Sequence, residues 1–362
     1  MFKIRFILLF LKKKMIVFNS LKIDFIKRLT TSSIIIGFEV PIGLLKDYQF
    51  ISGQYITLEA VISNQKARRS YSVCVDSAMG KLRIAVKELK NGLFSSYLNK
   101  KIKIGDFLKV STPEGRFLYK PSVQKQNFVS FAAGSGITPI LSILKSSLSS
   151  KTNHHFTLIY GNKTLADTMF YLELKNLEKK FSKQLLIYWV FSREEIVDSF
   201  FGRIDLSLLN FLFKKIQDFN NLYYICGPSK MSETLKNFLE GKKVPLDKIN
   251  AELFSPDEKQ NNVPTIESKK SISLSIFCDE IIHDLTITDS QTILDAALEN
   301  NIDVPYSCQG GVCSSCIARL KKGTVKMLKN EILTDEDVSE GLILTCQSIS
   351  TSNKIVVDYD GV

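Results

Sequence analysis

The stretch Cys308-Gln309-Gly310-Gly311-Val312-Cys313-Ser314-Ser315-Cys316, together with Cys346 further along, decides the fold of the C-terminal part of this chain. Its cysteines follow a C-x4-C-x2-C…C spacing, the pattern in which four thiolates hold a plant-type 2Fe-2S cluster. Three thiolates on one tight loop can surround such a cluster, and the fourth arrives from a distant strand. The sequence therefore predicts an iron-sulfur site with Cys308, Cys313, Cys316 and Cys346 as its ligands.

Small and hydroxyl-bearing residues within this loop suit a cluster. Gly310 and Gly311 let the main chain approach the inorganic sulfides and offer N–H groups to negative charge. Ser307, Ser314 and Ser315 are candidate hydroxyl donors that tune the potential. The alternative is a zinc site with four thiolates, but structural zinc usually takes paired C-x2-C ligands rather than a four-residue gap with two glycines.

The residues before the cluster loop predict a small mixed α/β module. β-rich runs at 272–277 and 282–287 precede an expected helix at 292–300, with Asp289 or Ser290 as its N-cap. A polar segment ahead of these runs has the composition of a linker. The final ninety or so residues are therefore expected to fold as a separate module.

Two different patterns precede that module. The first alternates short β-rich runs with turn residues and indicates an antiparallel barrel or sandwich; its runs are 33–40, 54–61, 69–75, 82–87 and 107–111. The second repeats an apolar strand, a glycine turn and an amphipathic helix, which is typical of a parallel α/β sheet; its strands are 128–132, 156–160, 185–191 and 222–226.

A glycine-rich turn follows the first strand of the α/β segment directly. Ala133-Gly134-Ser135-Gly136-Ile137-Thr138-Pro139 leads into an apolar-periodic helix at 140–148. Glycines allow the main chain to approach a pyrophosphate, and proline suits a first helical turn because no N–H is needed there. A strand before and a helix after are the context that a dinucleotide site requires. Gly134, Gly136 and Thr138 are therefore candidate nucleotide-binding residues.

A second motif lies in the barrel segment: Arg69-Ser70-Tyr71-Ser72 resembles the RxYS motif of the ferredoxin-NADP reductase family. The resemblance implies that the chain binds FAD and that these four residues contact it. Arg69 would pair with the flavin pyrophosphate, since a guanidinium fork suits phosphate oxygens. The Tyr71 ring would pack on the isoalloxazine, and the Ser72 hydroxyl would reach the reactive N5.

Further motifs extend the resemblance along the chain. Gly92-Leu93-Phe94-Ser95 resembles a phosphate-binding turn of the family, in which a helix N-terminus faces the diphosphate. Cys226-Gly227-Pro228 resembles the motif beside the nicotinamide, with Cys226 near the hydride path; its alternative interpretation is a buried strand residue. Glu252 and Phe254 stand where relatives have an acidic residue and an aromatic near the flavin.

The coenzyme preference rests on the end of the strand at 185–191. Ser192 and Arg193 stand where NADPH-using relatives place groups for the 2′-phosphate, whereas a carboxylate there would favour NADH. Arg203 is a second candidate contact. A solvated loop arginine is the alternative, and the expected coenzyme is NADPH.

The resemblance covers nearly the whole chain from about residue 17, and it implies a multidomain fold. The expected order is an antiparallel β-barrel FAD domain, a parallel-sheet α/β NAD(P)-binding domain, and an α+β β-grasp ferredoxin domain. The expected bounds are 15–122, 123–256 and 271–362, with a linker at 257–270. The run 306–316 and Leu344-Thr345-Cys346-Gln347 are similar to the subgroup of phenylacetyl-CoA epoxidase reductases. Ser52-Gly53-Gln54-Tyr55 replaces the usual Pro-Gly-Gln-Phe, which alters a turn and leaves the chemistry intact.

This resemblance implies an NADPH-dependent oxidoreductase that passes electrons through FAD and a 2Fe-2S cluster to a separate oxygenase-type acceptor. A phenylacetyl-CoA epoxidase-like partner is favoured, and the reductase of a fatty-acid desaturase or a Rieske oxygenase is the alternative. A different class remains open, in which the chain is an electron-carrier or redox-sensing module without its own NADPH oxidation. The terminal acceptor and the oligomeric state have no motif that one sequence displays.

Composition and charge limit which classes of protein and of partner the chain can belong to or bind. A 362-residue chain with 44% hydrophobic and 23% charged residues is folded and multidomain. The net charge of +11 comes from scattered lysines, without the stripe that nucleic-acid binding favours. This charge is unevenly distributed along the chain. Residues 271–362 contain 6 Lys and Arg and 14 Asp and Glu, a net charge of −8, and the remaining residues carry a net charge of +19. An acidic module beside a basic one suggests electrostatic docking, and simple solvation of two surfaces is an equal account.

Cysteine usage and the first residues bear on location. Seven cysteines in this length are no disulfide framework, so a reducing, cytoplasmic compartment is expected, and Cys74 and Cys278 are interpreted as buried apolar residues. The apolar run before Met15 is too short for a signal peptide or a spanning helix, and Met15 is an alternative start to Met1.

Overall fold

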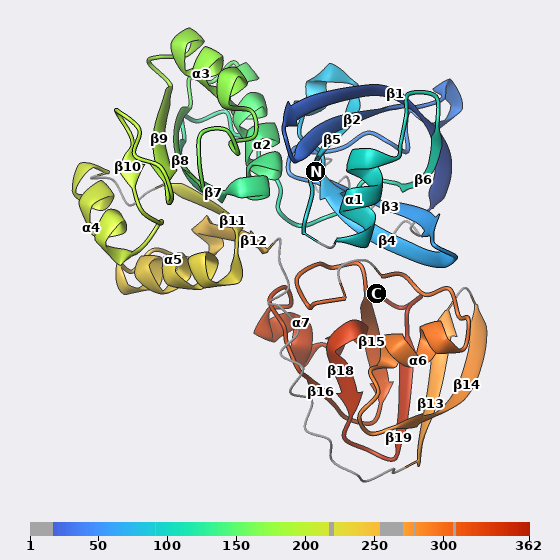
Figure 1. Ribbon diagram of the computed structural model, residues 1–362. Coiled ribbons are helices and arrows are strands. Elements are labelled where there is room, and N and C mark those ends of the chain that lie inside the picture. The colour runs from blue at the N-terminus through green and yellow to red at the C-terminus, as the bar shows by residue number, and fades with distance from the viewer. Residues whose placement is uncertain (1–16, 91, 217–220, 254–270, 279, 307–308) are drawn as a thin grey trace, which may run out of the picture. The chain divides into compact units, whose positions relative to one another are not determined.

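The computed structural model describes residues 17–362 except 91, 217–220, 254–270, 279 and 307–308 (Figure 1). The chain divides into two compact units, Ser20–Val263 with Ser307–Ser314, and Pro264–Tyr306 with Ser315–Val362. Each unit is described by itself. Within the described residues, no helix has the length and apolar character needed to cross a membrane.

The N-terminal half of the larger unit is a six-stranded sheet that closes on itself. Its strands run in the order β4-β3-β6-β1-β2-β5, with bounds β1 Phe18–Thr30, β2 Ser33–Glu39, β3 Tyr55–Ile62, β4 Gln65–Ser72, β5 Leu82–Lys87 and β6 Phe107–Ser111. An antiparallel bridge between Val73 and Ile84 joins the two outer strands. Inward residues such as Ile36, Ile56 and Leu58 are fully buried, so the barrel has a packed apolar core.

The second half of this unit is a parallel sheet in the order β10-β9-β8-β7-β11-β12. The strands are β7 Asn127–Ala133, β8 His155–Asn162, β9 Leu185–Phe191, β10 Phe200–Phe201, β11 Leu222–Gly227 and β12 Ile249–Leu253. The connecting helices are α2 Ile137–Ser149, α3 Tyr171–Lys180, α4 Leu206–Lys215 and α5 Ser229–Gly241. Parallel strands require such crossovers.

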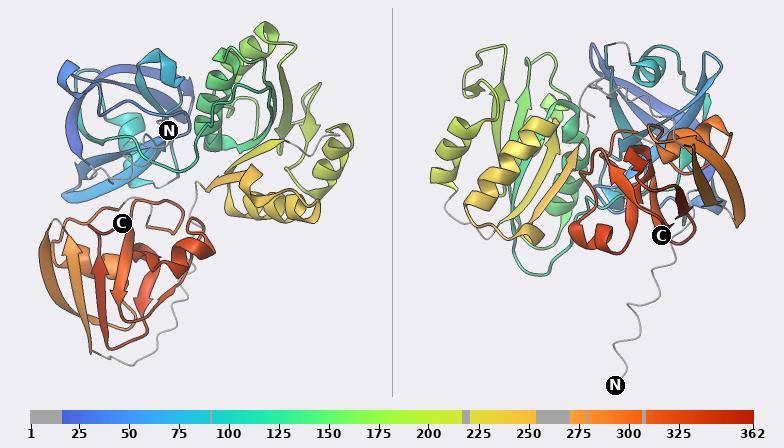
Figure 2. Two further views of the ribbon diagram at one scale, coloured as in Figure 1. Left: turned by 180° about the vertical axis from the view of Figure 1, so that it is seen from behind. Right: turned by 90° about the horizontal axis from the view of Figure 1, so that it is seen from below.

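Helices cover both faces of this sheet, as the views in Figures 1 and 2 show. Alternate residues of β7 point to opposite faces. Phe128 packs in the core that α2 and α3 complete, whereas Val129 and Phe131 pack in the core that α4 and α5 complete. These strands appear in the sequence as continuous hydrophobic runs because both faces of the sheet are covered by apolar residues.

The C-terminal unit is built on a five-stranded mixed sheet in the order β14-β13-β19-β15-β17. Its elements are β13 Ser271–Cys278, β14 Ile281–Thr288, α6 Ile293–Glu299, β15 Ile317–Lys322, β16 Val325–Met327, α7 Asp335–Ser339, β17 Leu342–Leu344, β18 Ser348–Ser350 and β19 Lys354–Asp358. Only the β13–β19 pair among the described pairs of this sheet is parallel. Helix α6 buries Ile293, Leu294, Ala296 and Ala297 in the core of this β-grasp unit.

Two expectations about elements were wrong or incomplete. The N-cap of α6 is Thr292, whose side chain accepts a hydrogen bond from the Asp295 N–H, rather than Asp289 or Ser290. Asp289 and Ser290 precede it in a turn, because the chain needs those residues to leave β14. Strand β1 was not expected, since its exposed lysines interrupt the apolar pattern.

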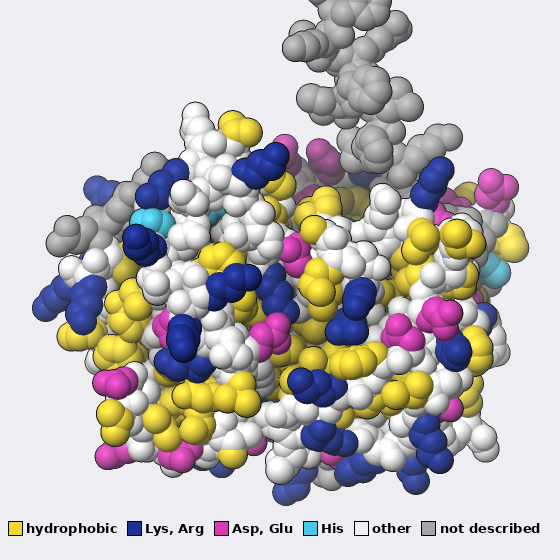
Figure 3. All heavy atoms as spheres, turned by 90° about the horizontal axis from the view of Figure 1, so that it is seen from above, with side chains coloured by type: hydrophobic (Ala, Val, Ile, Leu, Met, Phe, Trp, Pro, Cys, Tyr) yellow, Lys and Arg dark blue, Asp and Glu magenta, His cyan; other side chains and the backbone are white. Residues whose placement is uncertain are grey.

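Basic side chains are scattered over the face of the molecule that Figure 3 draws. On the face drawn in Figure 3, Lys and Arg side chains alternate with acidic and hydrophobic ones and form no continuous stripe.

Candidate functional site

The RxYS residues occupy the last four positions of β4, where the strand leaves the barrel. Register with β3 places Arg69 opposite Leu58 and Ser72 opposite Tyr55. The neighbouring Arg68 is buried and forms an ion pair with Glu59 at 2.6 Å (Nε to Oε2). Arg69, in contrast, is exposed and has no acidic partner within the described part of the chain. Arg69 is therefore the arginine available to a phosphate.

The predicted phosphate turn begins the helix α1, Leu93–Lys100, whose N-cap is Gly92 without a side-chain cap. The Ser95 hydroxyl accepts a hydrogen bond from the Leu89 N–H at 3.1 Å, so this serine holds the turn. Phe94 is buried, and its ring centroid lies 6.3 Å from that of Tyr71. Burial raises the pKa of Tyr71 above its ordinary value, so its phenol stays neutral. Phe94 thus supports the aromatic ring expected to face the flavin.

The glycine turn between β7 and α2 contains two glycines that have different surroundings. Gly134 adopts a positive φ of +53°, and a Cβ there would meet open space. A Cβ on Gly136 would stand 2.1 Å from the main-chain oxygen of Cys226, so close packing of the turn against β11 requires glycine at this position. The Tyr160 hydroxyl donates to the Gly134 carbonyl at 3.0 Å and fixes the turn. The open space beside Gly134 fits a nucleotide diphosphate.

Thr138 and the Cys226-Gly227-Pro228 motif complete the nucleotide side of the site. The Thr138 hydroxyl is buried and donates to the Ser135 carbonyl at 3.1 Å, so this threonine shapes the turn. Pro228 is the N-cap of α5, and Gly227 packs against Ala133, to which a Cβ would come within 3.1 Å. These residues hold the ends of β7 and β11 together.

A buried polar group lies where the barrel meets the nucleotide-binding sheet. Glu252 on β12 is paired with Cys226 on β11, and the Ser72 hydroxyl lies close enough to its carboxylate to lower its pKa. Its second oxygen, Oε2, is buried without a hydrogen-bond partner in the described structure. Burial raises the pKa of Glu252 to about 8, against the lowering by the Ser72 hydroxyl. A buried carboxyl group with a free oxygen is costly unless a bound group satisfies it.

Cys226 is the third member of this group. Its side chain is fully buried. Burial raises the pKa of the Cys226 thiol well above its ordinary value, and the Glu252 carboxylate adds to that shift. The thiol is therefore neutral and is not a thiolate nucleophile. Ser72, Cys226 and Glu252 together form a small polar site flanked by the open turn at Gly134, and this arrangement fits a flavin with a nicotinamide beside it.

The residues expected to set coenzyme preference lie on loops at the carboxyl edge of the sheet. Ser192 and Arg193 follow β9, and their N–H groups donate to the carbonyls of Asn162 and Lys163 at 3.0 Å each. Arg193 and Arg203 are exposed, and neither has an acidic partner among the residues that the structure describes. Both guanidinium groups are available to a ligand. Phe254 lies outside the described residues.

The sheet of the C-terminal unit brings two of the predicted cluster cysteines together. Ile317 at the start of β15 is paired with Leu344 at the end of β17, so Cys316 and Cys346 leave neighbouring strands at the same end. Thr345 is fully buried, and both its N–H (3.1 Å) and its hydroxyl (2.9 Å) donate to the Cys316 carbonyl. The Tyr359 hydroxyl donates in turn to the Thr345 hydroxyl at 2.8 Å. These bonds fix the two cysteine positions relative to each other.

The remaining predicted cluster ligands precede β15 in the sequence. Cys313 is half-buried, and Gln309 and Gly311 have positive φ values of 55° and 72° on either side of Gly310, as a tight loop requires. Cys308 lies outside the described residues. Among the residues with described positions, no three His, Cys, Asp or Glu side chains are grouped for a single metal ion.

Several residues that shape the site were not predicted from the sequence. Tyr160 and Thr345 hold the glycine turn and the cluster cysteines, but tyrosine in a strand and threonine in a loop carry no distinctive pattern. Ser142 and Ser146 on α2 bind the segment after β4. Their spacing of four residues along an apolar helix was a readable signal of a polar contact on one face.

Family models match three successive parts of the chain. An oxidoreductase FAD-binding domain matches residues 20–119, an oxidoreductase NAD-binding domain matches residues 131–237, and a 2Fe-2S iron-sulfur cluster binding domain matches residues 279–351. These matches agree with the arrangement of barrel, parallel sheet and β-grasp unit. They identify an oxidoreductase that carries FAD, nicotinamide-coenzyme and 2Fe-2S binding domains.

Known proteins resemble the chain over most of its length. It is 34% identical over 359 residues to a component of 1,2-phenylacetyl-CoA epoxidase from Escherichia coli K12, covering 96% of this chain and 99% of that protein. It is 28% identical over 337 residues to the ferredoxin reductase component of 3-ketosteroid-9-alpha-monooxygenase from Rhodococcus rhodochrous, covering 90% and 92%. The solved structure of phthalate dioxygenase reductase shares the fold, with a TM-score of 0.62, 22% identity, and coverage of 94% and 98%. The chain therefore belongs to the ferredoxin-NADP reductase family, among the electron-transfer reductases with a C-terminal 2Fe-2S domain that include this component of 1,2-phenylacetyl-CoA epoxidase.

Proposed function

We propose that this protein oxidises NADPH and delivers the electrons one at a time to a separate di-iron oxygenase of the phenylacetyl-CoA epoxidase type. Bound FAD supplies the exchange between two-electron and one-electron chemistry, and a 2Fe-2S cluster supplies the one-electron outlet. The observation that carries the proposal is the junction of Ser72, Cys226 and Glu252, where the ends of β4, β11 and β12 meet beside the open glycine turn.

The chain's own residues have distinct tasks in this scheme. We assign Arg69 and the N-terminus of α1 to the flavin diphosphate. Arg69 offers a guanidinium without an acidic partner among the described residues, and the helix offers the N–H groups of its first turn. Tyr71 covers the ring system and excludes water. Glu252, whose pKa burial raises to about 8, would hold a proton beside the Ser72 hydroxyl.

The choice of NADPH over NADH rests on Arg193 and Arg203. Both are exposed guanidinium groups without acidic partners in the described chain, and such groups match the 2′-phosphate that distinguishes NADPH. The test is kcat/KM with each coenzyme in the wild type, Arg193→Ala and Arg203→Ala. We expect Arg193→Ala to lose tenfold or more with NADPH and less than twofold with NADH. Equal losses with both coenzymes, or a wild type that prefers NADH, would refute the assignment.

The choice of acceptor rests on likeness to a protein named as a component of phenylacetyl-CoA epoxidase, at 34% identity over 96% of the chain. The test is coupled turnover: purified reductase, NADPH, and the oxygenase components of a phenylacetyl-CoA epoxidase, with product formation measured per NADPH consumed. Parallel reactions use a steroid monooxygenase component and a fatty-acid desaturase. Tight coupling only with the epoxidase supports the proposal, and tighter coupling with either alternative contradicts it.

A further inference from the structure

The helix α2 carries a row of polar side chains against the main chain that follows β4. The Ser142 hydroxyl donates to the Val75 carbonyl at 2.6 Å, and Ser142 is fully buried. One turn later, the Ser146 hydroxyl donates to Oδ1 of Asp76 at 2.8 Å. Residues four apart share a helix face, so both contacts belong to one surface. We call the contact between this surface and residues 74–76 the α2 seam.

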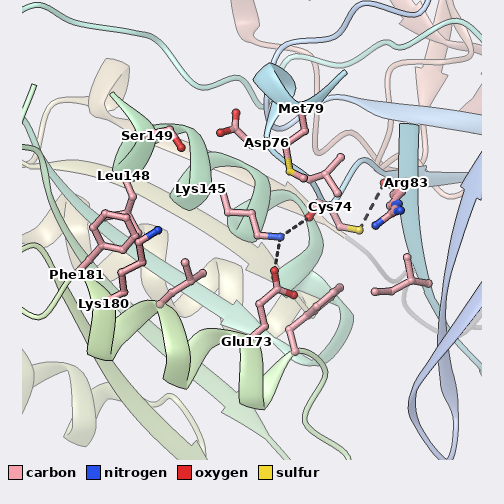
Figure 4. Close-up of a pocket in the computed structure, with 14 residues that line it drawn as sticks. Cys74, Asp76, Met79, Arg83, Lys145, Leu148, Ser149, Glu173, Lys180 and Phe181 are labelled. Carbon is pink, nitrogen blue, oxygen red and sulfur yellow. Dashed lines mark hydrogen bonds and ion pairs between the residues drawn. The ribbon is translucent and has the colours of Figure 1, made fainter. Parts of the chain in front are cut away.

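A lysine between the two serines adds a charged contact to the α2 seam. Lys145 Nζ lies 2.6 Å from Oε1 of Glu173 on α3 and 3.4 Å from the Cys74 carbonyl. Figure 4 shows Lys145 extending between these two groups at the wall of a cavity of about 350 Å³. The Lys145 side chain is 15% exposed and that of Glu173 is 42% exposed, so solvent reaches this ion pair from the glutamate side. The seam therefore contains two hydroxyl bonds and one charge-assisted bond.

The α2 seam joins the two elements that the proposed reaction must align. Helix α2 begins directly after the glycine turn 134–136, and residues 74–76 closely follow Ser72. Along the backbone, β4 and α2 are separated by more than sixty residues. A shift of the helix against residues 74–76 would therefore move the nucleotide turn relative to the Ser72 hydroxyl. Displacements of about 1 Å can cost two orders of magnitude in rate.

We propose that Ser142, Lys145 and Ser146 are positioning residues, which hold the nucleotide turn at a fixed distance from the flavin-binding end of β4. The inference rests on the proposed function, in which a coenzyme at that turn reduces a flavin beside Ser72. Ser142 and Lys145 act on the main-chain carbonyls of Val75 and Cys74, and Ser146 acts on the side chains of Asp76 and Ser52, rather than on coenzyme or flavin. Their loss should therefore slow the transfer step while leaving the affinity for the coenzyme nearly unchanged.

The same helix supplies a matched control. Ser147 is as deeply buried as Ser142, but its hydroxyl has no hydrogen-bond partner within the described structure. Ser147→Ala removes the same atom from the same helix without changing the α2 seam. Ser146→Thr is the conservative counterpart of Ser146→Ala, because threonine keeps the hydroxyl at a half-buried position.

The experiment compares the wild type with Ser142→Ala, Ser146→Ala, Ser146→Thr and Ser147→Ala, each as full-length protein. The first readout is amide hydrogen exchange in the peptide that contains residues 73–79, which requires no turnover. The second is the rate of flavin reduction after rapid mixing with NADPH, together with the Kd for NADP⁺. Exchange reports the opening of local structure, and the rate reports alignment.

We expect Ser142→Ala and Ser146→Ala to exchange at least fivefold faster at residues 73–79 and to reduce flavin at least tenfold more slowly, with Kd within twofold of the wild type. Ser146→Thr should recover most of the rate, and Ser147→Ala should match the wild type. If the two alanine variants match Ser147→Ala in exchange and rate, the inference is wrong. A wild type that NADPH does not reduce refutes the proposed function instead, and the exchange comparison still tests the α2 seam. If Ser142→Ala fails to fold, the comparison of Ser146→Ala with Ser146→Thr tests the inference instead.

Discussion

The Ser72 hydroxyl, at the end of the barrel strand β4, lies close enough to the Glu252 carboxyl group, on the outer strand β12 of the parallel sheet, to lower its pKa. The second carboxylate oxygen of Glu252 remains buried without a partner in the described structure. A fold that retains such a group against its desolvation cost usually uses it. The pair therefore marks the centre of the site.

The first prediction concerns the pH dependence of stability. Burial raises the pKa of Glu252 in the folded protein from 4.5 to about 8. Between these values the unfolded chain releases a proton that the folded chain retains, so this group lowers stability progressively as pH rises from about 4.5 to 8. Glu252→Gln removes that dependence. We expect its unfolding midpoint to exceed that of the wild type by more at pH 8.5 than at pH 5, measured by thermal denaturation.

The control for this prediction is Glu233→Gln, which removes an exposed carboxylate on α5. It should track the wild type at every pH. Ser72→Ala removes the hydroxyl that favours the ionised carboxylate of Glu252, so it should steepen the loss of stability with pH. A Glu252→Gln curve that runs parallel to the wild type would show that Glu252 titrates normally.

The second prediction contrasts two glycines of one turn. Alanine at position 136 would bring its Cβ to 2.1 Å from the Cys226 carbonyl, and a main-chain atom cannot rotate away. We expect Gly136→Ala to destabilise the protein by about 3 kcal/mol or more. In Gly134→Ala the added Cβ would enter open space, and the left-handed φ of this residue would be the only source of strain. We therefore expect the free energy of unfolding to fall by roughly 1–2 kcal/mol and coenzyme binding to weaken. Urea denaturation and NADP⁺ titration measure both, and equal costs would contradict this account of the turn.

The third prediction concerns the hydroxyl that ties the cluster cysteines together. Thr345→Val keeps the side-chain shape but removes the bond to the Cys316 carbonyl and leaves the Tyr359 hydroxyl without its acceptor. We expect a loss of about 1–3 kcal/mol in stability and faster release of iron to a chelator. Thr351→Val, at an exposed pair with Thr324, is the control and should behave as the wild type. Unchanged iron release in Thr345→Val would be evidence against this role.

The fourth prediction separates cluster ligands from structural cysteines. Cys346→Ser should abolish the iron-sulfur absorbance and the paramagnetic signal of the reduced cluster, while reduction of the flavin by NADPH continues. Cys278, buried in the last position of β13, should not be a ligand, so Cys278→Ala should retain two irons per chain. Iron analysis and electron paramagnetic resonance measure both variants. Iron loss from Cys278→Ala, or retention by Cys346→Ser, would overturn the ligand assignment.

The sequence allowed the architecture to be predicted wherever local pattern and tertiary burial agreed. Continuous apolar runs such as 185–191 became the two-faced parallel strands that their composition indicates. The N-cap of α6 was misplaced because Asp289, Ser290 and Thr292 all have capping side chains, and only the burial of Ile293 selects Thr292. Strand β1 was not predicted from the sequence because one of its faces is exposed to solvent.

Site chemistry was predictable where a motif is contiguous and was not where it is assembled by folding. The cluster loop, the glycine turn and Arg69–Ser72 are contiguous, so they could be named as candidates from the sequence. The proximity of Ser72 to Glu252 and the Thr345–Cys316 bond involve residues that are distant or inconspicuous in sequence. The close packing of Gly136 against Cys226 follows only from the register of β7 and β11.

The central claim is that one chain carries electrons from a nicotinamide coenzyme through a flavin to an iron-sulfur cluster. The most direct test is anaerobic rapid mixing of the full-length protein, loaded with FAD and the cluster, with NADPH while the visible spectrum is recorded. We predict bleaching of the flavin absorbance followed by bleaching of the cluster absorbance, with the second phase absent in Cys346→Ser. A protein whose flavin and cluster are reduced by dithionite but remain oxidised with NADPH and with NADH would contradict the account.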